Sequence, residues 1–472
     1  MLTMEGGESW GKQKSIQPTA SSYQLSANSS RLHWPFMASL SQSTRRRVDR
    51  RLMPFIFLLY VVSYLDRVNV GSAGLQMTKE LGFSDSVFGL GSGLFFIGYV
   101  LLEIPGAVLA EVWSARKWIA RILLTWGVLA SATGLIHTSG QFYTLRFFLG
   151  VAEAGFVPGI LVYLSHWYRA EDRGKAVSLF YAGIPASQVL GGPLAAVLLR
   201  LHWMGWSGWR WLLLLEGLPA IALGVIALLY LAEHPREAKW LKPEEREWLT
   251  AELARERASK SERITVWKAM SDPRVWLLGA SLFFGLNSAT GVSFWLPQIV
   301  QRMSAFDVSK VSLIASIPSL CSLPLMLLAG WHSDRTGERI WHAAIPRLLS
   351  AAALALSFAS IADRNVPVTV ALLSMAAAGF YCAHAGFWPL PNVFWGRAAA
   401  AAALGLINSC GNLGSSLGPY VLGVLSDRTG RFGAGLLYLA VCSFASATLV
   451  LFLRGAVATA RRQSAANLVE SA

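Results

Sequence analysis

Long apolar runs recur along this chain and set the strongest limit on what it can fold into. A helix needs about 20 mainly apolar residues to cross the hydrocarbon core of a bilayer, and many runs here reach that length. Only 14% of the 472 residues are charged, whereas a typical soluble domain carries about 25%. The sequence therefore predicts an all-α polytopic membrane protein.

Twelve segments qualify as transmembrane helices, six on each side of one long polar connection. We expect a disordered cytoplasmic tail over 1–44, a six-helix bundle over 45–232, a cytoplasmic linker over 233–273, a second six-helix bundle over 274–456 and a tail over 457–472. The predicted helices run over about 52–73, 88–110, 117–136, 140–165, 174–199, 211–232, 274–300, 310–331, 342–361, 367–390, 399–424 and 432–454.

The linker carries a helix signal of its own. Pro243 is followed by Glu244 and Glu245, and proline followed by acids is typical of a first helical turn. Five apolar residues would line one edge of this helix, which suits it to lie on the membrane surface. A plain solvated linker helix is the alternative. The five residues are Trp240, Leu241, Trp248, Leu249 and Leu253.

The two halves of the chain resemble each other. The stretch "GAVLAEVWSARK" begins at Gly106 and "GWHSDRTGER" begins 224 residues later, at Gly330. The pair Gly192-Pro193 recurs 226 residues later as Gly418-Pro419. Because each unit has an even number of spans, the copies are expected to be parallel, with a site between them near the middle of the membrane.

The net charge of +14 does not indicate a nucleic-acid partner, because the basic residues form no single stripe. They concentrate in "RRRVDRR" (45–51), in "RAEDRGK" (169–175) and in the connection over 233–274, whereas the loop over 136–143 has almost none. This alternation follows the positive-inside rule and predicts that both termini lie in the cytoplasm.

The stretch "YVVSYLDRVNVGSAG" (60–74) places Asp66 and Arg67 side by side within a membrane span. Each charge costs roughly 2.5–3.5 kcal/mol on the insertion scale, so something inside the protein must use them. Arginine offers a planar fork suited to a carboxylate. The alternative is a structural arginine paired permanently with an acid. Asp66 points about 100° further around the helix, so the two cannot serve one face equally.

Several motifs resemble those of one transporter family. The loop "GWHSDRTGER" matches the G-x-x-x-D-R-x-G-x-R signature of the major facilitator superfamily, and "GAVLAEVWSARK" resembles its degenerate copy in the anion:cation symporters. The motifs "YLDRVNVG", "RFFLGVAEAGFVPG", "WRWLLLLEGLPA" and "INSCGNLGSSLGPY" follow in the order typical of that branch. The resemblance covers about residues 45–455 and extends to bacterial permeases for tartrate, sugar acids and aromatic acids.

The resemblance implies roles for four charged residues. It places a substrate-binding arginine at Arg67 and a protonatable acid at Asp66, for which a structural partner of a helix-4 arginine is the alternative. It places the proton-coupling carboxylate at Glu153, seven residues after Arg146 and on the same helix face. Burial raises and a nearby arginine lowers the pKa of such a glutamate, a balance that a proton carrier needs. A fixed ion pair between helices 1 and 4 is the alternative.

Other polar residues in apolar spans are candidates for substrate contact, with helix–helix hydrogen bonding or core packing as the alternative in each case. Asn408 and Asn412 lie one turn apart and are placed to reach hydroxyls of a hydroxy acid. An imidazole at His384 could titrate or donate to an anion. The full set of predicted substrate-binding residues is Arg67, Arg146, Asn412, Asn408, Gln188, Tyr64 and His384.

The loop signature predicts a gate rather than a binding site. Asp334, Arg335 and Arg339 would latch helix ends through charge and helix dipole in one access state, with Arg116 in the degenerate copy.

Energy coupling is constrained by what the sequence lacks. There is no phosphate-binding GxxxxGK[ST] motif, and no catalytic or metal-ligand constellation, so we expect no enzyme activity, no cofactor and no metal. The prediction is a monomeric proton-coupled symporter of the bacterial inner membrane, importing a hydroxy-dicarboxylate such as tartrate by alternating access. The alternatives are import of an aromatic or sugar acid, a proton-driven exporter, and a non-transporting receptor.

Overall fold

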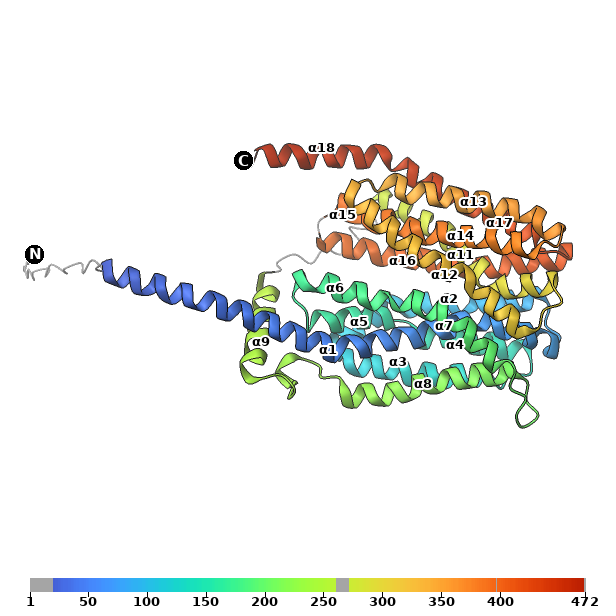
Figure 1. Ribbon diagram of the computed structural model, residues 1–472, viewed down its shortest axis with the longest axis horizontal. Coiled ribbons are helices and arrows are strands. Elements are labelled where there is room, and N and C mark those ends of the chain that lie inside the picture. Colours follow the sequence, from blue (N-terminus) through green and yellow to red (C-terminus); the bar gives the residue numbers. More distant parts are fainter. Residues whose placement is uncertain (1–19, 260–270, 396, 471–472) are drawn as a thin grey trace, which may run out of the picture.

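The computed structural model describes residues 20–259, 271–395 and 397–470. Throughout these ranges the regular elements are helices, and no strand occurs in them. Most helices run along one common axis, and α1 begins at the same end of the molecule at which α18 ends (Figure 1). We call this the terminal end, and the other the opposite end.

The helices account for the twelve predicted spans, three of which are broken into two pieces. The first half contains α1 (Ala20–Leu81), α2 (Asp85–Val112), α3 (Ala115–Thr133), α4 (Ser139–Glu153) with α5 (Phe156–Ser165), α6 (Ala170–Tyr181) with α7 (Gly183–Leu198), and α8 (Gly208–Tyr230). The second half contains α11 (Pro273–Met303), α12 (Val308–Thr336), α13 (Ile340–Ala362), α14 (Val366–Phe387) with α15 (Leu390–Phe394), α16 (Arg397–Thr429) and α17 (Gly433–Phe452).

Nine helical segments in the described part of the chain are long and apolar enough to cross a membrane. The three predicted spans outside this set have visible reasons. Helix α3 carries Arg116 and Lys117 in its first turn and Arg121 one turn later, and the fifth span is divided between α6 and α7. Helix α16 carries the polar, glycine-rich stretch "NSCGNLGSSLG" (408–418) in its middle.

Helix α1 overlaps the tail predicted over residues 1–44. Helix α1 extends back to Ala20, while residues 1–19 of the predicted disordered tail lie outside the described residues. Tertiary contacts hold the segment just before the span: Ser43 Oγ donates to Glu245 at 3.2 Å and Arg47 pairs with the same carboxylate at 3.4 Å. The predicted C-terminal tail likewise contains a helix, α18 (Arg454–Glu470).

The linker contains η1 (Pro235–Glu237) and α9 (Pro243–Ser259), so the predicted helix start at Pro243 is found; residues 260–270 of the linker lie outside the described ranges. Its apolar edge faces protein rather than lipid, because Leu241, Leu249 and Leu253 are buried in the main core. Trp240 stacks on Trp167 with ring centroids 5.4 Å apart. Neither the membrane-surface helix nor the solvated helix therefore describes α9.

The fourth span breaks directly after Glu153. Ala154 leaves the helical region (φ −55°, ψ 137°) and Gly155 adopts a left-handed conformation with φ +81°. A Cβ on Gly155 would also lie 2.9 Å from the Cα of Gly106, so both the conformation and the space favour glycine. The break leaves Glu153 as the last residue of α4.

Helices α2 and α16 bring the two halves together backbone against backbone. A Cβ on Gly93 would lie 2.2 Å from the carbonyl oxygen of Ser416, and one on Gly89 would lie 2.4 Å from that of Pro419. Helix α7 approaches α12 in the same way, since a Cβ on Gly192 would lie 2.6 Å from the carbonyl oxygen of Ser312. Small residues permit this close approach of membrane helices.

Candidate functional site

Arg67 and Glu153 form a buried ion pair between α1 and α4. The Nε and Nη2 of Arg67 donate to the same Glu153 oxygen, Oε1, at 3.0 and 2.8 Å, and Ser63 Oγ donates to it at 2.8 Å. The second oxygen, Oε2, is buried without a partner. The side chain of Arg67 keeps 16% exposure, whereas that of Glu153 has none, so the arginine is the member that faces free space.

Arg146 lies in the same cluster but makes no hydrogen bond. It is fully buried, with all three guanidinium nitrogens unpartnered. Asp66 and Glu153 are the carboxylates that act on its charge, and its guanidinium carbon lies 4.9 Å from the ring centre of Phe95. Glu153 therefore pairs with Arg67 on another helix, and not with Arg146, which lies seven residues earlier on its own helix.

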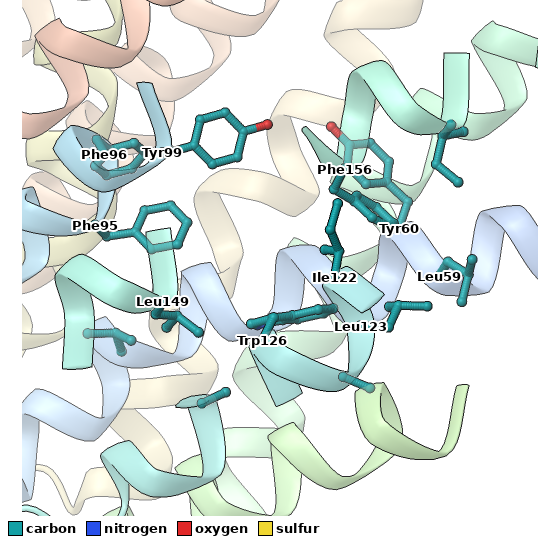
Figure 2. Close-up of a cluster of buried hydrophobic side chains, with 14 of the residues drawn as sticks. Leu59, Tyr60, Phe95, Phe96, Tyr99, Ile122, Leu123, Trp126, Leu149 and Phe156 are labelled. Atoms are coloured by element: carbon teal, nitrogen blue, oxygen red, sulfur yellow. The ribbon is translucent and has the colours of Figure 1, made fainter. Parts of the chain in front are cut away.

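Aromatic side chains surround this charged cluster. Figure 2 shows Tyr60, Phe95, Tyr99, Trp126 and Phe156, which come from α1, α2, α3 and α5, gathered in one buried region. Trp126 Nε1 donates to Asp66 at 3.3 Å, which turns Asp66 towards α3 while its neighbour in sequence turns towards α4. The predicted angular separation of the two charges is thus seen in their partners.

The two asparagines predicted to contact substrate are bonded to a carboxylate of the other half. Asn408 Nδ2 and Asn412 Nδ2 donate to Glu103 on α2, at 2.5 and 3.3 Å, and Ser409 Oγ donates at 3.0 Å. These bonds join α16 to α2 across the interface between the halves. The alternative of helix–helix hydrogen bonding describes this arrangement, and the partner is an acid that the sequence did not single out as part of a site.

Gln188 also joins the two halves. Its Nε2 donates to the hydroxyl of Tyr381, which links α7 to α14. Gln188 further lies beside Tyr64, and Tyr64 lies 5.8 Å from the guanidinium carbon of Arg67. Both predicted residues are therefore connected to the charged cluster, and Tyr381 is a neighbour that no sequence feature selected.

His384 turns back onto its own helix. Its Nδ1 lies 2.9 Å from the backbone carbonyl oxygen of Phe380, and the two rings pack edge to face with centroids 4.6 Å apart. This nitrogen is therefore engaged within α14.

The predicted gating residues contact their own halves. Arg339 Nη1 donates to Asp334 and to Ser333 at 2.8 and 2.9 Å, and the side chain of Asp334 is 74% exposed. The guanidinium of Arg335 lies over the ring of Trp331. Arg116 Nη1 donates to the carbonyl oxygen of Leu231 at 3.2 Å.

A small cavity lies between the halves. It measures about 70 Å³ and is bounded by Val68, Ser72 and Gln188 on one side and by α11, α12, α13 and α14 on the other. Its walls include the buried side chain of Arg347 on α13. Sequence reasoning missed this arginine, although a lone charge in the apolar stretch "HAAIPRLLSAAA" (342–353) is the same signal that selected Arg67.

Comparison with known proteins agrees with this architecture. Residues 56–419 match the family described as the Major Facilitator Superfamily. A putative tartrate transporter of Agrobacterium vitis is 40% identical over 419 residues, which cover 88% of this chain and 96% of that protein. A quinolone resistance transporter of Acinetobacter baumannii is 38% identical over 400 residues, covering 84% and 91%.

Among solved structures, the inward open conformation of the xylose transporter XylE from E. coli has a TM-score of 0.68 at 17% identity, covering 85% of this chain and 95% of that one. The chain belongs to the major facilitator superfamily. The predicted fold class and family resemblance are confirmed, and the protein is a multi-pass bacterial membrane transporter.

Proposed function

We propose that this transporter imports a small organic anion together with protons by alternating access, and that a hydroxy-dicarboxylate such as tartrate is the substrate. The observation that carries the proposal is the bond between Arg67 and Glu153, in which two donors of the arginine meet one oxygen of a buried carboxylate. A substrate carboxylate would compete with Glu153 for the same guanidinium.

This competition couples the proton to the anion. Protonation of Glu153 removes its negative charge and releases Arg67, whose fork then binds a substrate carboxylate in its place. Loss of the proton restores the ion pair and displaces the anion. Asp66 balances the charge of Arg146 and is the second proton-carrying candidate, because both lie in the same buried cluster.

The same proposal assigns an orientation and a gate. The terminal end carries the basic segments 45–51 and 169–175, so by the positive-inside rule it faces the cytoplasm and the opposite end faces outwards. Asp334, Arg335, Arg339 and Arg116 act at the cytoplasmic gate. The energy source is the proton gradient, no cofactor takes part, and the working unit is a monomer.

A proton-driven exporter on the same fold is the second candidate. The similarity to a quinolone resistance transporter supports it. An apolar cavity would suit that role, whereas the cavity here contains a buried arginine and several serines. Import of an aromatic or sugar acid is a narrower alternative that leaves the coupling unchanged.

Uptake into proteoliposomes under an inward proton gradient tests the proposal, with labelled tartrate, a sugar acid and an aromatic acid as substrates. The wild type should accumulate an organic acid, and accumulation should collapse when the gradient is dissipated. Glu153→Gln should retain counterflow and lose accumulation, because a neutral amide exchanges substrate without carrying a proton. Arg67→Ala should lose both.

Glu216→Gln is the matched control, since Glu216 is also a buried glutamate of the first half but accepts a hydrogen bond from Asn69. It should retain gradient-driven accumulation. A wild type that accumulates none of the acids, and instead extrudes a hydrophobic compound, would replace import by the exporter.

A further inference from the structure

One buried arginine of the second half has no acidic partner among the described residues. Arg347 on α13 is 1% exposed, and its Nε and Nη2 are buried without a hydrogen-bond partner. Its Nη1 donates to the carbonyl oxygen of Ala343 at 3.2 Å, and the ring centre of Phe387 lies 4.7 Å from the guanidinium carbon. A buried charge is costly unless an opposite charge or further hydrogen bonds offset it.

Arg210 shows what a structural buried arginine looks like in this protein. Its Nε and Nη2 donate to Glu80 at 3.1 and 3.0 Å. Its Nη1 donates to the carbonyl oxygens of Gly134 and Ile136 at 3.0 and 2.9 Å. Its donors are thus matched by fixed acceptors, whereas two of the three nitrogens of Arg347 have none.

The cavity supplies a place for the missing acceptor. Arg347 lines it together with Ser288, Ser350 and Tyr381, and its volume of about 70 Å³ is enough for a few water molecules. Its far wall contains Val68, the residue after Arg67, so the same space touches both halves of the protein. Hydroxyl groups beside a cation suit a hydroxylated anion.

We propose that Arg347 binds a second carboxylate of the transported anion, so that the substrate is a hydroxylated dicarboxylate held between Arg67 in one half and Arg347 in the other. This rests on the proposed function, in which Arg67 takes the first carboxylate. With Glu153 protonated, the three guanidiniums of Arg67, Arg146 and Arg347 are matched by Asp66 and the two substrate carboxylates. The loaded cluster is then neutral, whereas a monocarboxylate leaves one arginine unmatched.

Equilibrium binding to the full-length protein in detergent tests this without relying on transport. The probes are tartrate and its monoamide, which keeps the size and hydroxyl groups and loses one charge. The wild type should bind tartrate at least tenfold more tightly than the monoamide. Arg347→Gln should weaken tartrate binding by about 10–100-fold, the usual range for a lost charge-assisted contact, and change monoamide binding less than threefold.

Arg210→Gln is the matched control, because it removes a buried arginine that has fixed partners. It should lower the melting temperature and keep the preference for tartrate over the monoamide. Arg347→Gln should keep or raise the melting temperature, since it removes an unmatched buried charge. If Arg347 is instead structural, Arg347→Gln should lower the melting temperature and weaken the binding of tartrate and of the monoamide equally. That result would overturn the proposal.

The failure of this inference differs from the failure of the proposed function. If the wild type accumulates acids with protons but binds the monoamide as tightly as tartrate, or if Arg347→Gln keeps the wild-type preference, the second carboxylate site is wrong and symport stands. If the wild type neither binds nor accumulates any organic acid, the proposed function is wrong and the second site falls with it.

Discussion

The two ends of the interface between the halves are built differently. At the opposite end the halves are tied by charge: Arg302 pairs with Asp85, and Arg200 lies 3.5 Å from Asp307. Asp427 of α16 accepts from the backbone N–H groups of Asp85 and Ser86 at 3.0 and 2.8 Å, which caps the start of α2 with a residue of the other half. At the terminal end, by contrast, the charged loop residues are satisfied within their own half, as Asp334 with Arg339 shows.

This difference indicates that the opposite end is closed. Backbone contacts of Gly89 and Gly93 with α16 bring the halves together near the charged ties, whereas the last part of α12 carries exposed apolar residues such as Leu327 and Leu328. In an alternating-access cycle, bonds at one end must break before the other can close. The ties at the opposite end and the loop at the terminal end are therefore expected to alternate.

The largest effect is expected from a wedge at the closed end. A methyl group on Gly93 would lie 2.2 Å from the backbone oxygen of Ser416, so Gly93→Ala should prevent full closure. Overpacking costs about 1–3 kcal/mol, which is roughly 5–150-fold in a two-state equilibrium. Tartrate uptake should fall within that range, as measured by initial rates in proteoliposomes.

Gly405→Ala is its control on α16, because nothing lies within 4 Å of a Cβ at that position. It should leave the initial rate of tartrate uptake within about twofold of the wild-type rate and slightly stabilise the helix. Equal inhibition by both variants would show that helix flexibility, and not closure, was disturbed.

Breaking the charged tie should have a smaller effect in the same direction. Asp85→Asn removes the ion pair with Arg302, whose side chain is half-exposed, and weakens the bond that Ser426 donates to Asp85 at 2.6 Å. A partly exposed pair is worth about 1 kcal/mol or less, so the closed end should open about three- to fivefold more often. The rate at which an impermeant thiol reagent labels a cysteine introduced at Ser72, with the four native cysteines replaced, should rise by that factor. Unchanged labelling would place the tie outside the gate.

The loop that contains Asp334 and Arg339 should affect the rate of uptake without affecting the stability of the folded protein. Asp334→Asn loses an exposed pair, so the melting temperature should stay within about 1 °C of the wild type. Initial uptake should fall about two- to fivefold if the carboxylate latches helix ends in the other access state. A melting temperature that falls together with uptake would make the loop structural.

The smallest effect on transport is expected at the cap of α3, which belongs to one half alone. Burial alone would raise the pKa of Glu233, but hydrogen bonds from His166, Ser114 and the backbone N–H groups of Arg116 and Ala115 lower it to about 2. A lowered carboxyl pKa contributes stability above the ordinary value near 4.5, and the contribution is lost as the pH falls towards 2.

Glu233→Gln should therefore cost about 1 kcal/mol of stability at neutral pH, the usual value of a helix cap, with uptake almost unchanged. Between pH 5 and pH 2, the melting temperature of the variant should fall less steeply than that of the wild type. A variant whose melting temperature falls with pH as steeply as that of the wild type would exclude Glu233 as the titrating cap.

Helical periodicity and the family motifs were sufficient to predict the charged cluster. Asp66 and Arg67 had to diverge around α1, and Glu153 lay in an apolar span, so an ion pair between helices 1 and 4 was one of the two predicted arrangements. The partners chosen across the interface could not be predicted, because they depend on how the halves dock. Asn408 and Asn412 donate hydrogen bonds to Glu103, and Gln188 donates one to Tyr381, and in each case the two residues are far apart in the chain.

Two further residues show what the local sequence does not decide. Arg347 carried the signal of a lone intramembrane charge, yet it lay in no recognised motif. His384 was isolated in an apolar helix, and sequence alone does not distinguish a ring aimed into a cavity from one bonded to the preceding turn of its own helix.

The cap that Asp427 places on α2 also has a consequence for the order of assembly. The start of α2 is synthesised 342 residues before the carboxylate that satisfies its N–H groups at Asp85. During synthesis the first six spans therefore enter the membrane with the N–H groups of Asp85 and Ser86 without these acceptors, while Ser84 of the same half caps the helix by accepting from the N–H of Val87. The two bonds to Asp427 form only when the second six spans are in place. Two separately expressed halves should accordingly leave the first turn of α2 frayed until they associate.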